Sequence, residues 1–134
     1  MTIVIILAAG SSTRLGPLTR NVPKGLLNIG AKPIIQKQIE LFCRKKISDI
    51  FIVTGPNSEK FNFKNVTYIK DKNYEEHDVL GSLMAARSIM NTDMLMCYSD
   101  ILFDDKILDQ MLNFQGDIGI AVEMNWLPGY ENRT

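Results

Sequence analysis

A loop rich in small and hydroxyl side chains follows the first apolar run of the chain. Its residues are Ala8, Ala9, Gly10, Ser11, Ser12 and Thr13. Small side chains let a ligand approach the backbone closely, and successive N–H groups can form a concave site for an anion. Arg14 and Lys24 add cations near this loop, and Arg20 is a third candidate. The combination predicts a site that binds a polyphosphate.

Two well-known phosphate-binding motifs do not fit this loop. Gly10 and Gly16 lack the spacing of the Walker sequence, and Pro17 stands where that motif continues. The G-x-G-x-x-G fingerprint of dinucleotide-binding proteins is also absent, which disfavours a dehydrogenase. An ordinary Gly-Ser loop with solvated charges is the alternative interpretation.

The charge balance excludes partners that are held mainly by bulk charge. The 134 residues include 15 Lys and Arg and 15 Asp and Glu, so the formal net charge is zero. Nucleic-acid and anionic-membrane binders usually carry a basic excess, so we expect neither kind of partner. An apolar content of 46% is typical of a globular protein. The length predicts a single domain over residues 1–134.

Cysteine usage and the N-terminal residues favour a cytoplasmic location. Cys43 and Cys97 are the only cysteines in the sequence and lie far apart, which argues against a disulfide framework or a zinc cluster. We expect both to be buried, reduced thiols. The N-terminal apolar run lacks a basic segment and is too short to span a membrane, so a buried strand explains it better.

Strands alternate with helices along the chain, which predicts a mostly parallel α/β sheet that is doubly wound, with helices on both faces. The predicted strands are residues 3–7, 50–54, 66–69, 94–98 and 118–123. The predicted helices are residues 33–45, 81–90 and 104–114, the last with Asp104 as N-cap. We also expect five methionines in the core: Met84, Met90, Met94, Met96 and Met111. Ligands of such sheets bind beyond the carboxyl ends of the strands.

Several motifs together resemble the signature of the nucleotidyltransferases that activate sugar phosphates and related small phosphates. They are Leu7-Ala8-Ala9-Gly10, Arg14-Leu15, Pro23-Lys24, Gly30-Ala31-Lys32-Pro33, Gly81-Ser82-Leu83 and Tyr98-Ser99-Asp100. The resemblance covers most of the chain. It implies the Rossmann-like fold of the nucleotide-diphospho-sugar transferases.

The resemblance also implies roles for individual residues. Leu7, Ala8, Ala9 and Gly10 match the backbone that frames the base and ribose, and Gly81 and Ser82 match positions near the nucleotide. Residues 10–14 match the loop around the triphosphate, with Arg14 on the phosphates. Lys24 matches the lysine at the reacting centre, and Asp100 matches the aspartate that binds Mg²⁺. If the first and fourth strands are neighbours, Asp100 lies opposite the Gly10 loop. Taken alone, Asp100 could equally be an N-cap or turn residue.

The implied reaction is Mg²⁺-dependent transfer of a nucleoside monophosphate from an NTP to a small phosphate or phosphonate acceptor, with release of pyrophosphate. The chain looks most like the branch that uses CTP and acts on phosphocholine or aminoalkylphosphonates, while sugar 1-phosphates stay open as acceptors. Aromatic rings beside a carboxylate are a usual way to bind an alkylammonium group. Trp126, Tyr130 and Glu131 fit that description. Asp71, Glu75, Glu76 and Asp78 form a second acidic cluster, and His77 within it needs no catalytic role.

The chain is short beside that family and looks C-terminally truncated. Family members continue with strands that complete the acceptor pocket and supply a second metal carboxylate, which no residue here matches. A fragment, a site completed by a partner (a second copy included) and an inactive chain all stay open. A nucleotide-binding module without catalysis is the alternative of another class.

Overall fold

A computed structural model describes residues 1–11 and 13–125. The chain divides into two compact units, Met1–Leu102 and Phe103–Thr134. Within the part of the chain that is described, no helix is long and apolar enough to cross a membrane.

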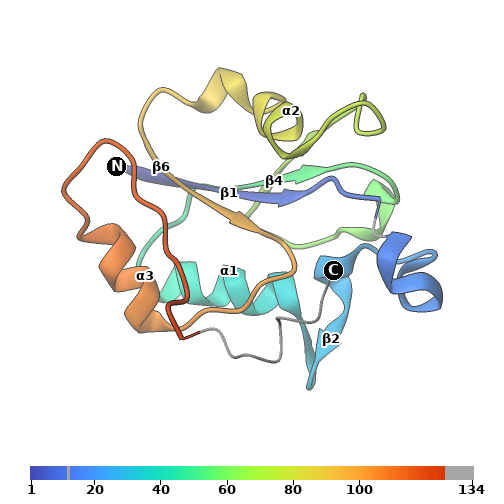
Figure 1. Ribbon diagram of the computed structural model, residues 1–134, viewed down its shortest axis with the longest axis horizontal. Coiled ribbons are helices and arrows are strands. Elements are labelled where there is room, and N and C mark those ends of the chain that lie inside the picture. The colour runs from blue at the N-terminus through green and yellow to red at the C-terminus, as the bar shows by residue number, and fades with distance from the viewer. Residues whose placement is uncertain (12, 126–134) are drawn as a thin grey trace. The chain divides into compact units, whose positions relative to one another are not determined.

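The first unit is built on a parallel sheet of four strands. They are β1 (Thr2–Ala8), β4 (Ile50–Thr54), β5 (Thr67–Lys70) and β6 (Asp93–Tyr98), in the order β5-β4-β1-β6 (Figure 1). β1 pairs with β4 on one side and with β6 on the other. Val4, Ile5 and Ile6 are fully buried because β1 lies inside the sheet and both of its faces are covered. The predicted parallel sheet and the pairing of the first and fourth strands are confirmed.

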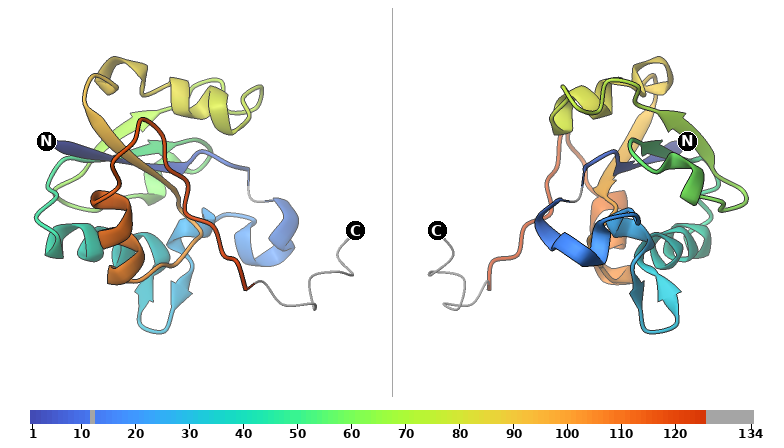
Figure 2. Two further views of the ribbon diagram at one scale, coloured as in Figure 1. Left: turned by 60° about the vertical axis from the view of Figure 1, so that its left-hand side comes forward. Right: turned by 90° about the vertical axis from the view of Figure 1, so that its right-hand side faces the viewer.

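Helices cover both faces of this sheet. α1 (Ile34–Arg44) and α2 (Val79–Met84) lie on opposite sides of it in Figure 1, and Figure 2 shows the same arrangement from two other directions. α1 buries a stripe of apolar residues, with Ile35 and Phe42 at 1% exposure or less. On the α2 side, Ile3, Ile5 and Leu7 of β1 form a core cluster with Val53 and Ala86. The expected doubly wound α/β fold is therefore confirmed.

Short elements connect these layers. Among the described residues these include the 3₁₀ segments η1 (Thr13–Thr19), which is kinked at Gly16, η2 (Lys24–Leu26), η3 (Ser58–Lys60) and η4 (Arg87–Ile89). A small antiparallel hairpin joins β2 (Asn28–Ile29) to β3 (Lys32–Pro33). Gly30 in its turn has a φ of 71°, a conformation that glycine adopts without steric cost. Pro33 is the N-cap of α1, one residue before the helix begins.

Three expectations within the first unit are wrong in detail. The predicted helix 81–90 is interrupted: α2 ends at Met84, and the separate 3₁₀ segment η4 begins at Arg87. Met84, Met94 and Met96 are each more than 40% exposed, so they are not core residues. Cys43 is exposed on α1, and only Cys97 is a buried thiol. Burial raises the pKa of Cys97 to about 12, which keeps that thiol neutral.

The second unit contains α3 (Asp105–Leu112). Asp104 caps this helix as predicted, because its carboxylate accepts a hydrogen bond of 3.0 Å from the backbone N–H of Ile107. The predicted strand at 118–123 is wrong: these residues have no regular structure. Ile118 and Ile120 are at least 80% exposed. Alternating apolar residues form a strand only where a neighbouring strand pairs with their backbone.

Candidate active site

The predicted site residues meet at the carboxyl edge of the sheet. Backbone hydrogen bonds join the ends of neighbouring strands there: Asp71 donates to Thr54 at 2.8 Å and Ser99 donates to Leu7 at 3.0 Å. Gly55 lies directly against the backbone of Ala9, where a Cβ atom would clash. The loops after all four strands are thus held side by side, as expected for a ligand site in a parallel α/β sheet.

Lys24 and Asp100 are brought together across a long separation in sequence. The Lys24 Nζ atom lies 3.5 Å from Asp100 Oδ2. The two side chains are 29% and 40% exposed, so both can reach a ligand from solvent. The sequence suggested each residue separately, and the structure places them as a pair. Lys24 could pair with a phosphate, and Asp100 could hold a metal ion that would offset the charge of that phosphate.

Gly25 explains how Lys24 comes so close to the end of β6. A Cβ atom on Gly25 would clash with the side chain of Ile35 in α1 and would lie 2.9 Å from Ser99 Cβ. Only glycine therefore lets the η2 turn pack between α1 and the loop that carries Asp100. Sequence analysis missed this residue, because the requirement arises from tertiary packing alone.

Gln38 is a second residue that sequence analysis missed. Its side chain is 2% exposed, although the pattern of α1 would assign a buried position to an apolar residue. Its Nε2 atom donates hydrogen bonds to the carbonyl oxygens of Tyr98 at 2.8 Å and Ile101 at 2.7 Å, on either side of Asp100. Gln38 Oε1 is a buried atom without a hydrogen-bond partner. The amide therefore fixes the loop that presents Asp100.

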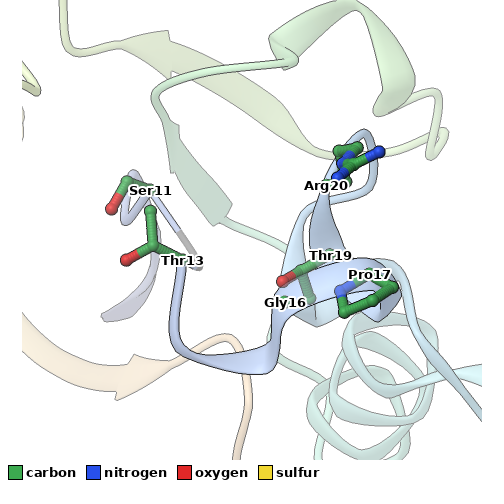
Figure 3. A pocket seen from close by; sticks show the side chains of 6 residues that line it. All are labelled: Ser11, Thr13, Gly16, Pro17, Thr19 and Arg20. Carbon is green, nitrogen blue, oxygen red and sulfur yellow. The ribbon is translucent and has the colours of Figure 1, made fainter.

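The first loop forms a pocket of about 320 Å³. Its lining residues are Ser11, Thr13, Gly16, Pro17, Thr19 and Arg20. In Figure 3 Ser11 and Thr13 lie on one side of the pocket, and Thr19 and Arg20 lie on the other. Gly16 turns the chain between these sides with a φ of 54°. Hydroxyls and a guanidinium that line one pocket suit an anionic group.

One predicted member of this loop, Arg14, stands apart from the pocket. Arg14 is exposed and does not line it, so Arg20 is the cation that the structure places there. Ser12 lies outside the described residues. The proposed contacts of Arg14 with phosphates stay a prediction.

Gly81 and Ser82 lie in the first turns of α2 and are tied to residues at the end of β5. Asp78 caps α2 by accepting a hydrogen bond of 2.9 Å from the Gly81 N–H. The Ser82 hydroxyl is buried and donates to the Asp71 carboxylate at 2.9 Å. The ring of His77 lies against Gly81, where it would clash with a Cβ atom. The nucleotide contacts assigned to Gly81 and Ser82 stay a prediction, and the structure shows what holds them in place.

Asp71 differs from the other members of the acidic cluster. It is 2% exposed, and its carboxylate accepts hydrogen bonds from His77 Nδ1, Ser82 Oγ and the Asn73 N–H. Burial alone would raise the pKa of Asp71, but these hydrogen bonds, with His77 first among them, hold it below its usual value. The Asp71 carboxylate is therefore engaged in internal contacts and does not face solvent.

Within residues 1–11 and 13–125, no cluster of three or more His, Cys, Asp or Glu side chains could hold a metal ion by itself. Mg²⁺ is commonly bound by one or two carboxylates together with substrate phosphates and water. Asp100, exposed at the edge of the sheet, fits one such ligand position. The acceptor residues proposed from the sequence, Trp126, Tyr130 and Glu131, lie outside the described residues.

Comparisons with curated proteins support the nucleotidyltransferase resemblance. The choline-phosphate cytidylyltransferase of Streptococcus pneumoniae is 34% identical over 103 residues, which cover 74% of this chain and 45% of that protein. The bifunctional protein GlmU of Methanococcus maripaludis is 32% identical over 124 residues, which cover 87% of this chain and 29% of that protein. The CTP:phosphoglutamine cytidylyltransferase of Campylobacter jejuni is 27% identical, over 96% of this chain and 55% of its own length. The chain thus spans about half or less of these relatives.

Comparison with solved structures gives a consistent result. The CTP:phosphocholine cytidylyltransferase from Streptococcus pneumoniae superposes with a TM-score of 0.72 at 34% identity, over 78% of this chain and 47% of that one. A family model described as MobA-like NTP transferase domain matches residues 4–125, nearly the whole described chain. The chain belongs to the family of MobA-like NTP transferase domains.

Proposed function

We propose that this chain carries the nucleotide site of a Mg²⁺-dependent cytidylyltransferase. In the proposed reaction, an oxygen of a small phosphate or phosphonate acceptor attacks the α-phosphorus of CTP. A new P–O bond forms, the bond between the α-phosphorus and its bridging oxygen breaks, and pyrophosphate leaves. The observation that carries the proposal is the 3.5 Å approach of Lys24 to Asp100 beside the first loop.

Each proposed role follows from the charge that the reaction develops. The attack brings two anions together, so cations at the α-phosphate lower the repulsion and stabilise the transition state. Lys24 is the proposed cation at the α-phosphate, and Arg20 with the hydroxyls of Ser11 and Thr13 would bind the departing phosphates. Asp100 would hold Mg²⁺, which supplies further neutralisation of the phosphate oxygens when bound. Arg14 is proposed as an additional phosphate contact.

The choice of CTP and of the acceptor rests on relatives. Two of them are named for cytidylyl transfer, one to choline phosphate and one to phosphoglutamine. Both acceptor names denote small phosphorylated molecules with a nitrogen-containing part. We therefore place phosphocholine and aminoethylphosphonate first among the acceptors, with Trp126, Tyr130 and Glu131 as proposed contacts for the alkylammonium group. Sugar 1-phosphates are the second candidate class.

A screen of pyrophosphate release tests the proposal. The full chain is incubated with Mg²⁺ and each of the four NTPs, against phosphocholine, 2-aminoethylphosphonate and several sugar 1-phosphates. We expect release with CTP and an aminoalkyl acceptor, and loss of release when Mg²⁺ is chelated. Release only with a sugar 1-phosphate would replace the acceptor assignment. Nucleotide binding by calorimetry without release from any pair would favour a binding module instead.

A further inference from the structure

Asp71 is a buried carboxylate that the proposed reaction does not use. Its side chain is 2% exposed, and it sits directly after β5, at the same sheet edge as the candidate site. Its backbone N–H donates to Thr54, the last residue of β4, at 2.8 Å. A buried charge is costly unless hydrogen bonds compensate for the lost water. The contacts of Asp71 therefore indicate what this carboxylate does in the fold.

The partners of Asp71 belong to the segment that leads into α2. Its two carboxylate oxygens both lie 2.9 Å from His77 Nδ1, and Oδ2 also accepts from Ser82 Oγ at 2.9 Å. His77 in turn lies against Gly81, which has no room for a Cβ atom beneath the imidazole ring. Asp71 thus holds the Gly81–Ser82 pair in two ways. It binds the Ser82 hydroxyl directly, and it binds the His77 ring that packs against Gly81.

The inward direction of the Ser82 hydroxyl matters for ligand binding. Since Ser82 Oγ donates to Asp71 and the residue is 7% exposed, this side chain serves as an anchor. Gly81 is the partly exposed member of the pair, so a ligand can approach it only on the side that His77 does not cover. A backbone that must contact a ligand has to be held in one position, and groups fixed in advance lose less entropy on binding.

We propose that Asp71 is a positioning residue for nucleotide binding. Through its contacts with Ser82 and His77, Asp71 fixes the Gly81–Ser82 segment. This inference rests on the proposed function, because it takes that segment to lie beside the bound nucleotide. It predicts that Asp71 governs nucleotide affinity without touching the nucleotide. A merely structural residue would change the stability of the fold and leave the affinity of the folded protein unchanged.

The test is calorimetric titration of the full chain with CTP in the presence of Mg²⁺, at a temperature where every variant is folded. Asp71→Asn keeps the size of the side chain but removes its charge, and Ser82→Ala removes a single hydroxyl in case the first variant does not fold. We expect each to raise the dissociation constant about tenfold, the effect of one lost hydrogen bond to a charged group. Since both act through the same contact, the double variant should bind about as weakly as either single variant.

Glu40→Gln is the matched control. Glu40 is a carboxylate with hydrogen bonds of its own, to Lys32 at 2.8 Å, but it lies on the outer face of α1. Its variant should bind CTP as the wild type does. In turnover assays Asp71→Asn should raise the KM for CTP and leave kcat within about twofold, because uniform binding is lost.

Three results are decisive. Weaker binding by both single variants, without further loss in the double variant, supports the positioning role. Affinities equal to wild type, with only a lowered melting temperature, overturn it and leave the proposed function intact. Failure of the wild type to bind any of the four NTPs overturns the proposed function, and this inference with it.

Discussion

Two uncharged residues set the distance between Lys24 and Asp100. Gly25 lets the turn that carries Lys24 approach Ser99, and Gln38 fixes the carbonyls on either side of Asp100. The charged residues stand in recognisable motifs, so their types and spacing were enough to predict them. Gly25 and Gln38 were not predictable, because their roles depend on which elements pack together. At this scale the sequence was enough to propose which charged residues form the site, but not to predict the contacts that position them.

Gly25→Ala tests the positioning of Lys24. The added methyl group would clash with Ile35 and crowd Ser99, and overpacking of this kind costs about 1–3 kcal/mol. We expect a lower free energy of unfolding in urea and a reduced rate of Mg²⁺-dependent pyrophosphate release. Gly10→Ala is the stability control, since its Cβ atom would meet nothing within 4 Å. A Gly25→Ala protein as stable as Gly10→Ala would show that the turn has room to adjust.

The elements that were predicted well are those with a strong local signal. The apolar runs of β1 and β4 and the N-cap Asp104 of α3 lie where expected. β6 was also found, but Met94, Met96 and Tyr98 on one of its faces are exposed, and among the described strands β6 is the edge strand beside β1. Residues 118–123 have the alternation of a strand and no regular structure. Sequence patterns give the propensity of a segment, whereas neighbours decide whether the strand forms and which face is buried.

Gln38→Leu tests the link between α1 and the loop after β6. The variant leaves the carbonyls of Tyr98 and Ile101 without the donor they have now. Loss of such buried hydrogen bonds costs roughly 1–3 kcal/mol. We expect this loss in urea unfolding, with a weaker apparent affinity for Mg²⁺ in turnover assays. The control is Gln36→Leu on the same helix, which removes only a 3.2 Å hydrogen bond to Glu40. It should change neither the unfolding free energy nor the apparent affinity for Mg²⁺ by much. Equal effects of the two substitutions would refute the role of Gln38.

At the scale of the whole first unit, the site spans the carboxyl edge of the sheet from Asp71 after β5 to Asp100 after β6. The parallel order of the strands gathers loops that are distant in sequence. The alternation of strands and helices predicted this gathering, and the strand order β5-β4-β1-β6 agrees with it. The network around Asp71 was not predicted, because the acidic cluster was only noted beside the acceptor candidates and no internal contacts were assigned to it. If Asp71 positions the Gly81–Ser82 segment as proposed, the same hydrogen bonds support both the stability of the fold and the geometry of the site.

The acid stability of the protein should reveal this coupling. The pKa of Asp71 is lowered in the folded state, so its carboxylate stabilises the fold above its unfolded pKa of about 3.9. That stabilisation is lost as the pH falls below this value and through the lower folded-state pKa. We expect the unfolding free energy of the wild type to fall more steeply below about pH 4 than that of Asp71→Asn. Parallel curves in urea titrations between pH 7 and pH 2 would argue against an ionised, hydrogen-bonded Asp71.

The most direct test of the central claim is Mg²⁺-dependent pyrophosphate release by Asp100→Asn beside Asp93→Asn. Both aspartates belong to the same part of the fold, but Asp93 begins β6 at the opposite edge of the sheet from Asp100. We predict that Asp100→Asn abolishes release while its melting temperature stays near that of the wild type, and that Asp93→Asn keeps wild-type release. Undiminished release by a folded Asp100→Asn protein would contradict the account, because the carboxylate at the end of β6 would then play no part in the reaction.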